Sequence, residues 1–234
     1  MPKILALEAS TEQCSAAILD DSKLYSSCSN KPRAHAQSLL PMVDSLLSQS
    51  DLSLADLDCI AYDCGPGSFT GLRICLGVAQ GLSFGANLDL LGINSLEAMA
   101  HAAHVKFKNS AEGALCLLDA RMGELYWAVY LWGSEKPNAL IEPRLDHPNE
   151  FEERFNQQCS NIPLVAVGPG VTLLSEQAIV YQDSDASIYP TAESVATLAG
   201  YKLESGCLTA PENAELTYLR NEVSWNKRQR IRQP

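Results

Sequence analysis

The sequence has no Cys-x-x-Cys pair, although it contains eight cysteines. They are scattered singly, several of them inside apolar runs, which is typical of reduced and mostly buried thiols. It also has no signal-peptide pattern and no run of about 20 apolar residues that could span a bilayer. The most apolar segment, residues 69–85, is interrupted by Arg73 and Gln80. We therefore expect a cytoplasmic protein without a membrane partner.

Basic charge is scarce as well. The 17 lysines and arginines stand against 28 aspartates and glutamates, which gives a net charge of -11. Such a chain is not expected to hold nucleic acid on a broad basic surface of its own. Its last eight residues are an exception, since they contain Lys227, Arg228, Arg230 and Arg232. A solvated terminus is the common interpretation of such a tail, and contact with RNA or an acidic partner is the alternative.

Several catalytic motifs are missing. The glycine-rich stretch GPGSFTG, residues 65–71, lacks the Gly-Lys-Ser/Thr ending of a P-loop, and Thr70 occupies the third-glycine position of a dinucleotide fingerprint. There is no His-Glu-x-x-His motif, so a metallopeptidase is the least favoured class of enzyme. His101 and His104 are three residues apart without a nearby Glu-x-x-His pattern, and we interpret them as surface or core histidines.

The segment from residue 59 to residue 85 organises the chain. Residues 59–63 read as a buried strand that ends in a glycine turn, and Ser68 or Thr70 can cap the helix that follows. Gly77 and Gly81 lie four residues apart on this helix, so another helix could approach closely at that face. Spacing alone favours close packing inside one domain, and the alternative is a face offered to a second protein.

The first half of the chain follows a recognisable order of elements. Residues 3–9, 14–20 and 23–29 read as a meander of three strands, and residues 34–50 read as a helix that Pro41 should bend. After the central strand and helix, a strand near residues 90–93 leads to a helix from about Ser95, with Asn94 as its cap and Glu97 completing a capping box. This order is typical of a ribonuclease-H-like half.

The second half echoes the first. Residues 106–113 are polar and mark a boundary, after which residues 114–120 read as a strand ending near Asp119 and residues 124–132 as its returning partner. Asp119 follows Glu8, the acid of the first strand, at an offset of 111 residues, which suggests a duplicated fold. Residues 164–170 give another strand with a glycine turn, and residues 191–203 a helix. We predict domains at 1–108 and 109–210, followed by a C-terminal segment, 211–234.

Six features in this order resemble the TsaB family, also called YeaZ: the acid-ended first strand, the helix behind His35, GPGSFTGLR (65–73), LDARMGELYWAVY (118–130), VGPG (167–170) and YLRNEV (218–223). The resemblance implies an α/β fold of the actin, sugar kinase and Hsp70-like (ASKHA) class, a duplicated ribonuclease-H-like fold with two subdomains of mixed sheets flanked by helices. It also implies a non-catalytic partner of the TsaD (Gcp) protein, needed to form N6-threonylcarbamoyladenosine at position 37 of tRNAs that read ANN codons. The implied partners are TsaD, the ATPase TsaE through the TsaD complex, a second copy of the chain, and tRNA indirectly.

The resemblance places a partner interface on two N-terminal helices, and self-association and TsaD binding should compete for it. The implied interface residues are His35, Leu39, Val43, Leu46, Gly67, Phe69, Thr70, Leu72, Arg73, Leu76, Gly77, Gln80 and Gly81. The catalytic sister protein holds a metal with two histidines at i and i+4 of one helix, whereas here His35 is followed by Leu39 at that spacing. We therefore predict neither a metal nor a cofactor.

A nucleotide cleft of this fold class needs acids to hold magnesium and glycine turns around the phosphates. The resemblance suggests a vestigial cleft formed by Glu8, Ser10, Asp119, Gly168 and Gly170. Asp119 could instead be buried against Arg121 as a structural pair. An active kinase or ATPase that uses Glu8 and Asp119 remains the alternative function.

Overall fold

The computed structural model of the protein describes residues 2–31, 34–134, 136–174, 179–203 and 206–220. The basic cluster at Lys227, Arg228, Arg230 and Arg232 lies outside the described residues. No helix in these ranges combines the length and the apolar character that a membrane span requires.

The first sheet has the strand order β3-β2-β1-β4-β5. Strands β1 to β3 form an antiparallel meander, and β4 and β5 run parallel to β1. The meander predicted from the sequence is therefore confirmed. The strands are β1 (Lys3–Glu8), β2 (Cys14–Asp20), β3 (Lys23–Ser29), β4 (Cys59–Gly65) and β5 (Leu90–Asn94).

The second sheet repeats this topology, with the order β10-β9-β6-β7-β8. Its first three strands in sequence are antiparallel neighbours, and β9 and β10 run parallel to β6. Equivalent strands thus occupy equivalent places in both sheets, which confirms the duplicated fold. The strands are β6 (Gly113–Arg121), β7 (Glu124–Leu131), β8 (Asn138–Asp146), β9 (Leu164–Val167) and β10 (Asp183–Asp185).

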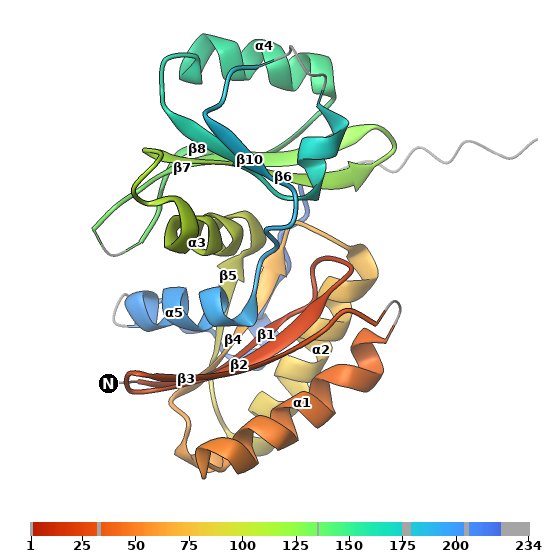
Figure 1. Cartoon of the computed structure of the whole chain (residues 1–234). Coiled ribbons are helices and arrows are strands. Elements are labelled where there is room, and N and C mark those ends of the chain that lie inside the picture. Colours follow the sequence, from red (N-terminus) through yellow and green to blue (C-terminus); the bar gives the residue numbers. More distant parts are fainter. Residues whose placement is uncertain (1, 32–33, 135, 175–178, 204–205, 221–234) are drawn as a thin grey trace, which may run out of the picture.

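Helices cover the sheets (Figure 1). The helices and 3₁₀ turns are α1 (His35–Ser50), η1 (Leu54–Asp56), α2 (Phe69–Ala86), α3 (Ser95–Phe107), α4 (Pro148–Cys159), η2 (Pro169–Leu173), α5 (Ala192–Lys202) and η4 (Pro211–Asn213). Helices α1 and α2 pack on one face of the first sheet through apolar residues such as Leu39, Leu46 and Cys75. Helix α4 covers the outer face of the second sheet, where Phe151 meets Trp127 at 5.0 Å between ring centroids.

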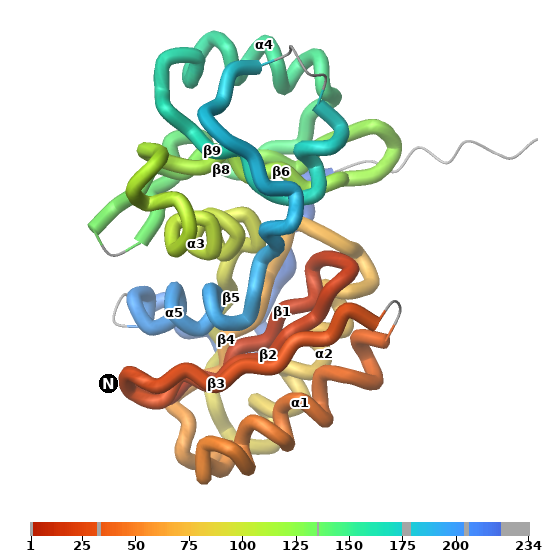
Figure 2. The backbone as a smooth tube through the Cα atoms, in the orientation of Figure 1, coloured from red at the N-terminus to blue at the C-terminus, as the bar shows by residue number. Residues whose placement is uncertain are grey.

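The last helix of each half packs against the sheet of the other half. Helix α3 follows β5, yet most of its buried residues, Met99 and Phe107 among them, pack against the second sheet. Helix α5 follows β10 and returns to β1 and β2 of the first sheet, as Figure 2 shows. Residues 192–202, which we placed in the second domain, therefore share a core with the first half. The predicted domain ranges themselves stay a prediction.

The helix ends show how local sequence sets these elements. Asn94 caps α3, since its side-chain oxygen accepts hydrogen bonds from the backbone N–H groups of Leu96 and Glu97 at 2.9 and 3.3 Å. Glu97 does not complete the predicted capping box, because its carboxylate instead pairs with Lys202 of α5 at 2.5 Å. Helix α1 continues through Pro41, and the bend expected there stays a prediction.

Candidate functional site

Helix α2 begins where the loop after β4 packs on the turn after β1. Ser68 is its cap: the Ser68 N–H donates to the Ser10 carbonyl at 2.7 Å, and the Ser68 Oγ accepts from the Gly71 N–H at 3.3 Å. A Cβ atom on Gly67 would overlap the Ser10 carbonyl oxygen, and one on Gly71 would overlap that of Ala9. These two glycines therefore permit the backbone contact that fixes the start of α2.

Further along α2, the glycines have open space beside them. Gly77 and Gly81 are exposed, and a Cβ atom on either would meet no heavy atom within 4 Å. Cys75, in contrast, lies in the core. The expectation of close packing inside one domain, which spacing alone favoured, is therefore wrong, because no described element of this chain approaches the glycine face.

Exposed aromatic and basic side chains border this surface. Phe69 and Phe84 are 57% and 64% exposed. The Arg73 guanidinium lies 3.6 Å from the centroid of the Phe69 ring, and its Nε donates to the Tyr218 hydroxyl at 3.2 Å. We call the surface formed by Phe69, Thr70, Arg73, Gly77, Gly81 and Phe84 the α2 face.

Four of the predicted interface residues do not lie on a surface. Leu39, Val43, Leu46 and Leu72 are at most 3% exposed and belong to the monomer core or its edge. Leu39, Val43 and Leu46 form an apolar stripe on α1, and this stripe packs on the chain's own sheet. These side chains hold α1 and α2 in place and present nothing to a partner.

Other predicted interface residues make contacts within the chain. Leu76 and Gln80 are half-buried, and the Gln80 Nε2 donates to the Pro211 carbonyl at 2.7 Å. The His35 Nε2 lies 3.2 Å from the Gln13 carbonyl oxygen, so this histidine ties α1 to the end of the first turn. Tyr218 also borders the α2 face, through its contact with Arg73. We did not predict Tyr218 as a site residue, because the two residues are 145 positions apart and no local sequence pattern relates them.

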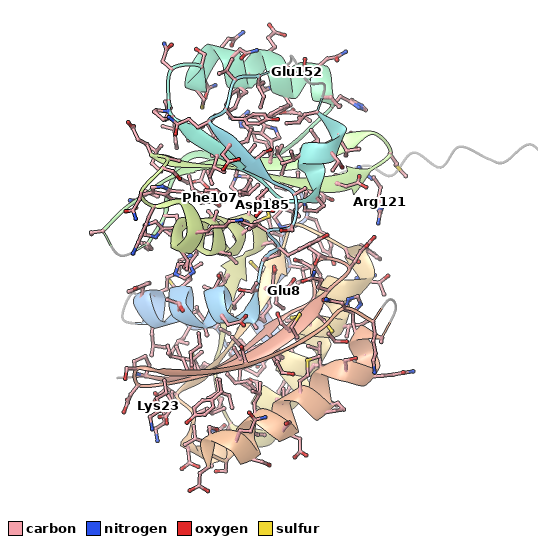
Figure 3. All side chains as sticks on the ribbon, in the orientation of Figure 1. Glu8, Lys23, Phe107, Arg121, Glu152 and Asp185 are labelled. Carbon is pink, nitrogen blue, oxygen red and sulfur yellow. The ribbon has the colours of Figure 1, made fainter. Side chains whose placement is uncertain are left out.

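The first-strand acid, Glu8, is fully buried where the halves meet (Figure 3). Its Oε1 accepts hydrogen bonds from the Ser10 N–H at 2.6 Å and the Ser10 hydroxyl at 2.7 Å. Its Oε2 is buried without a partner among the described residues. Burial first, and the neighbouring Asp63 second, raise the pKa of Glu8 well above its usual range.

Asp63 is an acid that we did not predict as a site residue. It is fully buried at the end of β4, one register step beyond the pairing of Leu7 with Tyr62, which places it beside Glu8. Its Oδ1 accepts from the Gly65 N–H at 2.8 Å and from the Ser95 hydroxyl at 2.5 Å. Burial raises its pKa to about 6. Its signal in the sequence was an acid closing an apolar strand before a glycine turn, as Glu8 closes β1.

The acid pair predicts a measurable loss of stability with rising pH. Both carboxyls have raised pKa values in the folded state, so the folded protein binds protons more tightly than the unfolded chain. The contribution of these two carboxyls to stability should therefore be greatest below about pH 4, where both states are protonated, and should be lost as the pH rises through 6. We expect Glu8→Gln to remove part of this slope, so that the gain in stability over the wild type is larger at pH 8 than at pH 5.

Urea titrations from pH 5 to pH 8 would measure this difference. Glu112→Gln, at an exposed glutamate, is the control, since it should leave the slope unchanged. A Glu8→Gln protein with the same pH slope as the wild type would show that folding does not raise the pKa of Glu8.

The predicted cleft residues of the second half lie in different surroundings. The side chain of Asp119 is 33% exposed, and it accepts from the Arg121 N–H at 2.7 Å and from the Arg121 guanidinium at 3.0 Å. The predicted structural pair thus exists, but it is not buried. Gly168 and Gly170 are buried, and a Cβ atom on either would come within 3.0 Å of Leu117. Their role in this structure is to bring the end of β9 against β6.

The remaining histidines also have structural contacts. The His101 Nδ1 lies 3.1 Å from the Ser194 hydroxyl, and the His104 ring lies 5.0 Å from the Trp132 ring. Burial lowers the pKa of both histidines. Among the described residues, no group of three or more histidine, cysteine, aspartate and glutamate side chains is arranged to hold a metal ion.

Two ribonuclease-H-like sheets of equal topology, joined across a junction that encloses the first-strand acid, define a protein of the ASKHA fold class. Comparison with known proteins agrees. A family model described as "TsaD: tRNA N6-adenosine threonylcarbamoyltransferase" matches residues 29–224.

Relatives that match over nearly the whole chain identify a narrower family. The chain is 39% identical to the tRNA threonylcarbamoyladenosine biosynthesis protein TsaB of Escherichia coli, covering 96% of this chain and 97% of that one. It is 34% identical to TsaB of Haemophilus influenzae, with 96% of each covered. The solved structure of YeaZ from Pseudomonas aeruginosa superposes with a TM-score of 0.84 and 34% identity, over 94% of this chain and 100% of that one. The chain belongs to the TsaB family.

Proposed function

We propose that this protein is the non-catalytic, TsaD-binding subunit required to form N6-threonylcarbamoyladenosine at position 37 of tRNAs that read ANN codons. It acts in the cytoplasm, forms a homodimer in the absence of TsaD, and joins a TsaD complex that recruits the ATPase TsaE. Membership of the TsaB family supports the pathway, because relatives across nearly the whole chain carry that name.

The observation that carries the partner-binding part is the open α2 face. Glycines in a helix interior cost about 1 kcal/mol each relative to alanine, and here the chain's own fold gains no packing from Gly77 or Gly81. A second helix could approach the α2 backbone closely at these positions, while Phe69 and Phe84 supply apolar contact area at the borders. Because one face serves both partners, homodimer and TsaD complex exclude each other.

The net charge of -11 fits a subunit that meets tRNA through its partners. The geometry does not favour the alternative, an active kinase or ATPase that uses Glu8 and Asp119. The Glu8 carboxylate is enclosed and already accepts two hydrogen bonds from Ser10, and Asp119 is paired with Arg121. Neither acid is presented to a nucleotide in this arrangement.

Reconstituted threonylcarbamoyl transfer tests the proposal. Purified TsaD, TsaE, tRNA and threonylcarbamoyl adenylate would be combined with and without this protein, and the protein alone would serve as control. We expect modified tRNA only when all components are present, and no ATP turnover by the isolated chain. Transfer that does not depend on this protein, or magnesium-dependent ATP turnover by the chain alone, would refute the proposal.

A further inference from the structure

Residues 209–220, within the last described range of the chain, run from the first half of the molecule to the second. It begins at the edge of the first sheet, where Thr209 and Leu90 exchange two backbone hydrogen bonds of 2.8 Å. It ends at Arg220, on the turn between β6 and β7. We call this segment the strap.

Side chains and backbone of the first half hold the strap along its length. Gln80 of α2 donates to the Pro211 carbonyl at 2.7 Å, and the Tyr62 hydroxyl donates to the Glu215 carbonyl at 2.9 Å. The Thr217 N–H then donates to the Cys64 carbonyl at 2.7 Å. This last contact requires Gly65 beside it, since a Cβ there would lie 3.0 Å from the Thr217 oxygen. The strap is thus fixed to the first half before it crosses.

Arg220 makes the contact with the second half. Its Nη2 donates to the Ala120 carbonyl at 3.1 Å, to the Arg121 carbonyl at 3.4 Å and to the Glu124 carboxylate. Only 17% of its side chain is exposed, and that of Glu124 is 22% exposed. Charge-assisted hydrogen bonds to several acceptors in a half-enclosed site are stronger than an exposed ion pair. Within the described ranges, Arg220 supplies every hydrogen bond from the strap to the second half.

The turn that Arg220 binds has an unusual backbone. Arg121, Met122 and Gly123 all have positive φ angles, of 64°, 57° and 77°. Two of these residues are not glycine, and left-handed backbone is unfavourable for them unless other contacts stabilise it. The two carbonyls that accept from Arg220 are that of Arg121, in this turn, and that of Ala120, directly before it. Arg220 and the turn conformation therefore depend on each other.

A cavity of about 520 Å³ lies behind the strap, with a wall formed by Thr217 and Leu219. Its other walls include Glu97 of α3, Lys202 of α5 and Tyr130 of the second sheet. The strap thus forms one wall of a pocket between the two halves.

We propose that the strap restrains movement between the two halves, that Arg220 closes it, and that it carries changes at the α2 face to the β6–β7 turn. The route runs through Tyr218, which accepts a hydrogen bond from Arg73 and stands two residues before Arg220. Arg73 belongs to the α2 face, so a molecule bound there would change the position of Tyr218 and weaken or strengthen the hydrogen bonds of Arg220 to the β6–β7 turn. That consequence rests on the proposed function, whereas the strap itself does not.

Hydrogen exchange of the full-length chain tests the strap without any partner. Arg220→Ala should raise exchange in peptides covering residues 119–124 by about tenfold or more, as expected for the loss of charge-assisted bonds that hold a local turn. Peptides of β1 should keep wild-type exchange. Arg144→Ala, at an exposed arginine on β8, is the matched control and should change neither region.

Two further variants make each part of the proposal independently refutable. Glu124→Gln keeps the size of the acceptor and removes its charge, so it should raise exchange at residues 119–124 by a smaller factor even if Arg220→Ala proves unstable. Tyr218→Ala should raise exchange at the same turn, whereas Tyr201→Ala at a similarly exposed tyrosine should not. Unchanged exchange in both Arg220→Ala and Glu124→Gln would overturn the strap, and an effect of Tyr218→Ala confined to α2 would overturn the transmission.

Discussion

Replacing Gly81 by arginine should abolish partner binding while leaving the monomer folded. A Cβ atom at this position meets nothing within 4 Å in the isolated chain, so the new side chain projects freely into solvent. In a complex, the same side chain would stand between two helices whose backbones approach closely, and its charge would be buried without a partner. Losses at the centre of an interface of this kind are about 100-fold or more in affinity.

The same substitution should slightly increase the stability of the monomer. Arginine is a better helix former than glycine by about 0.8 kcal/mol, so the Gly81→Arg monomer should unfold at a slightly higher denaturant concentration. Binding to purified TsaD by calorimetry, and self-association by sedimentation, would be measured beside urea unfolding. Gln158→Arg adds the same charge at an exposed position of α4 and should bind like the wild type. Undiminished binding of Gly81→Arg would place the interface elsewhere.

Much of the fold could be predicted because the strand and turn signals are local. The meander of the first three strands, the strand that ends in a glycine turn, and the returning pair around Asp119 all follow from alternation and from turn residues. The acid at the end of the first strand of each half also predicted the duplication. The structure shows that the repeat includes all five strands of each sheet.

Other features could not be predicted because they depend on contacts between distant segments. Strand β8 and helix α4 were not predicted, although Phe151 and Phe155 lie one helical turn apart on α4. The return of α5 to the first sheet depends on tertiary contacts, and the alanine-rich face of α5 does not by itself indicate which sheet it covers. Tyr218 joins the α2 face only because the strap brings it there.

The candidate site shows a related limit. Apolar periodicity placed Leu39, Val43 and Leu46 on one helix face, but periodicity alone does not say whether that face meets the chain's own sheet or a partner. The same ambiguity applied to the glycines of α2. Gly67 and Gly71 are needed for a close contact within the chain, whereas Gly77 and Gly81 have open space beside them. One helix therefore carries two kinds of glycine that sequence spacing does not separate.

Because Gly71 is in close contact with the chain and Gly77 is not, the same substitution should have opposite effects on stability at the two positions. Gly71→Ala should destabilise the protein by about 3 kcal/mol, because the added methyl group overlaps the Ala9 carbonyl and the start of α2 must move off the turn after β1. Gly77→Ala, six residues further along the same helix, should instead stabilise it by about 0.5–1 kcal/mol, since alanine is the better helix former and nothing opposes its side chain.

Urea unfolding of both variants under identical conditions measures the two effects against each other. The slope of the unfolding free energy with urea should remain that of the wild type, so that the midpoints report stability directly. Both changes add one methyl group to α2, so the difference of about 4 kcal/mol between them arises mainly from the contact with the Ala9 carbonyl. Equal midpoints for the two variants would mean that the loop before α2 adjusts without cost, and that Gly71 does not fix the position from which the α2 face is presented.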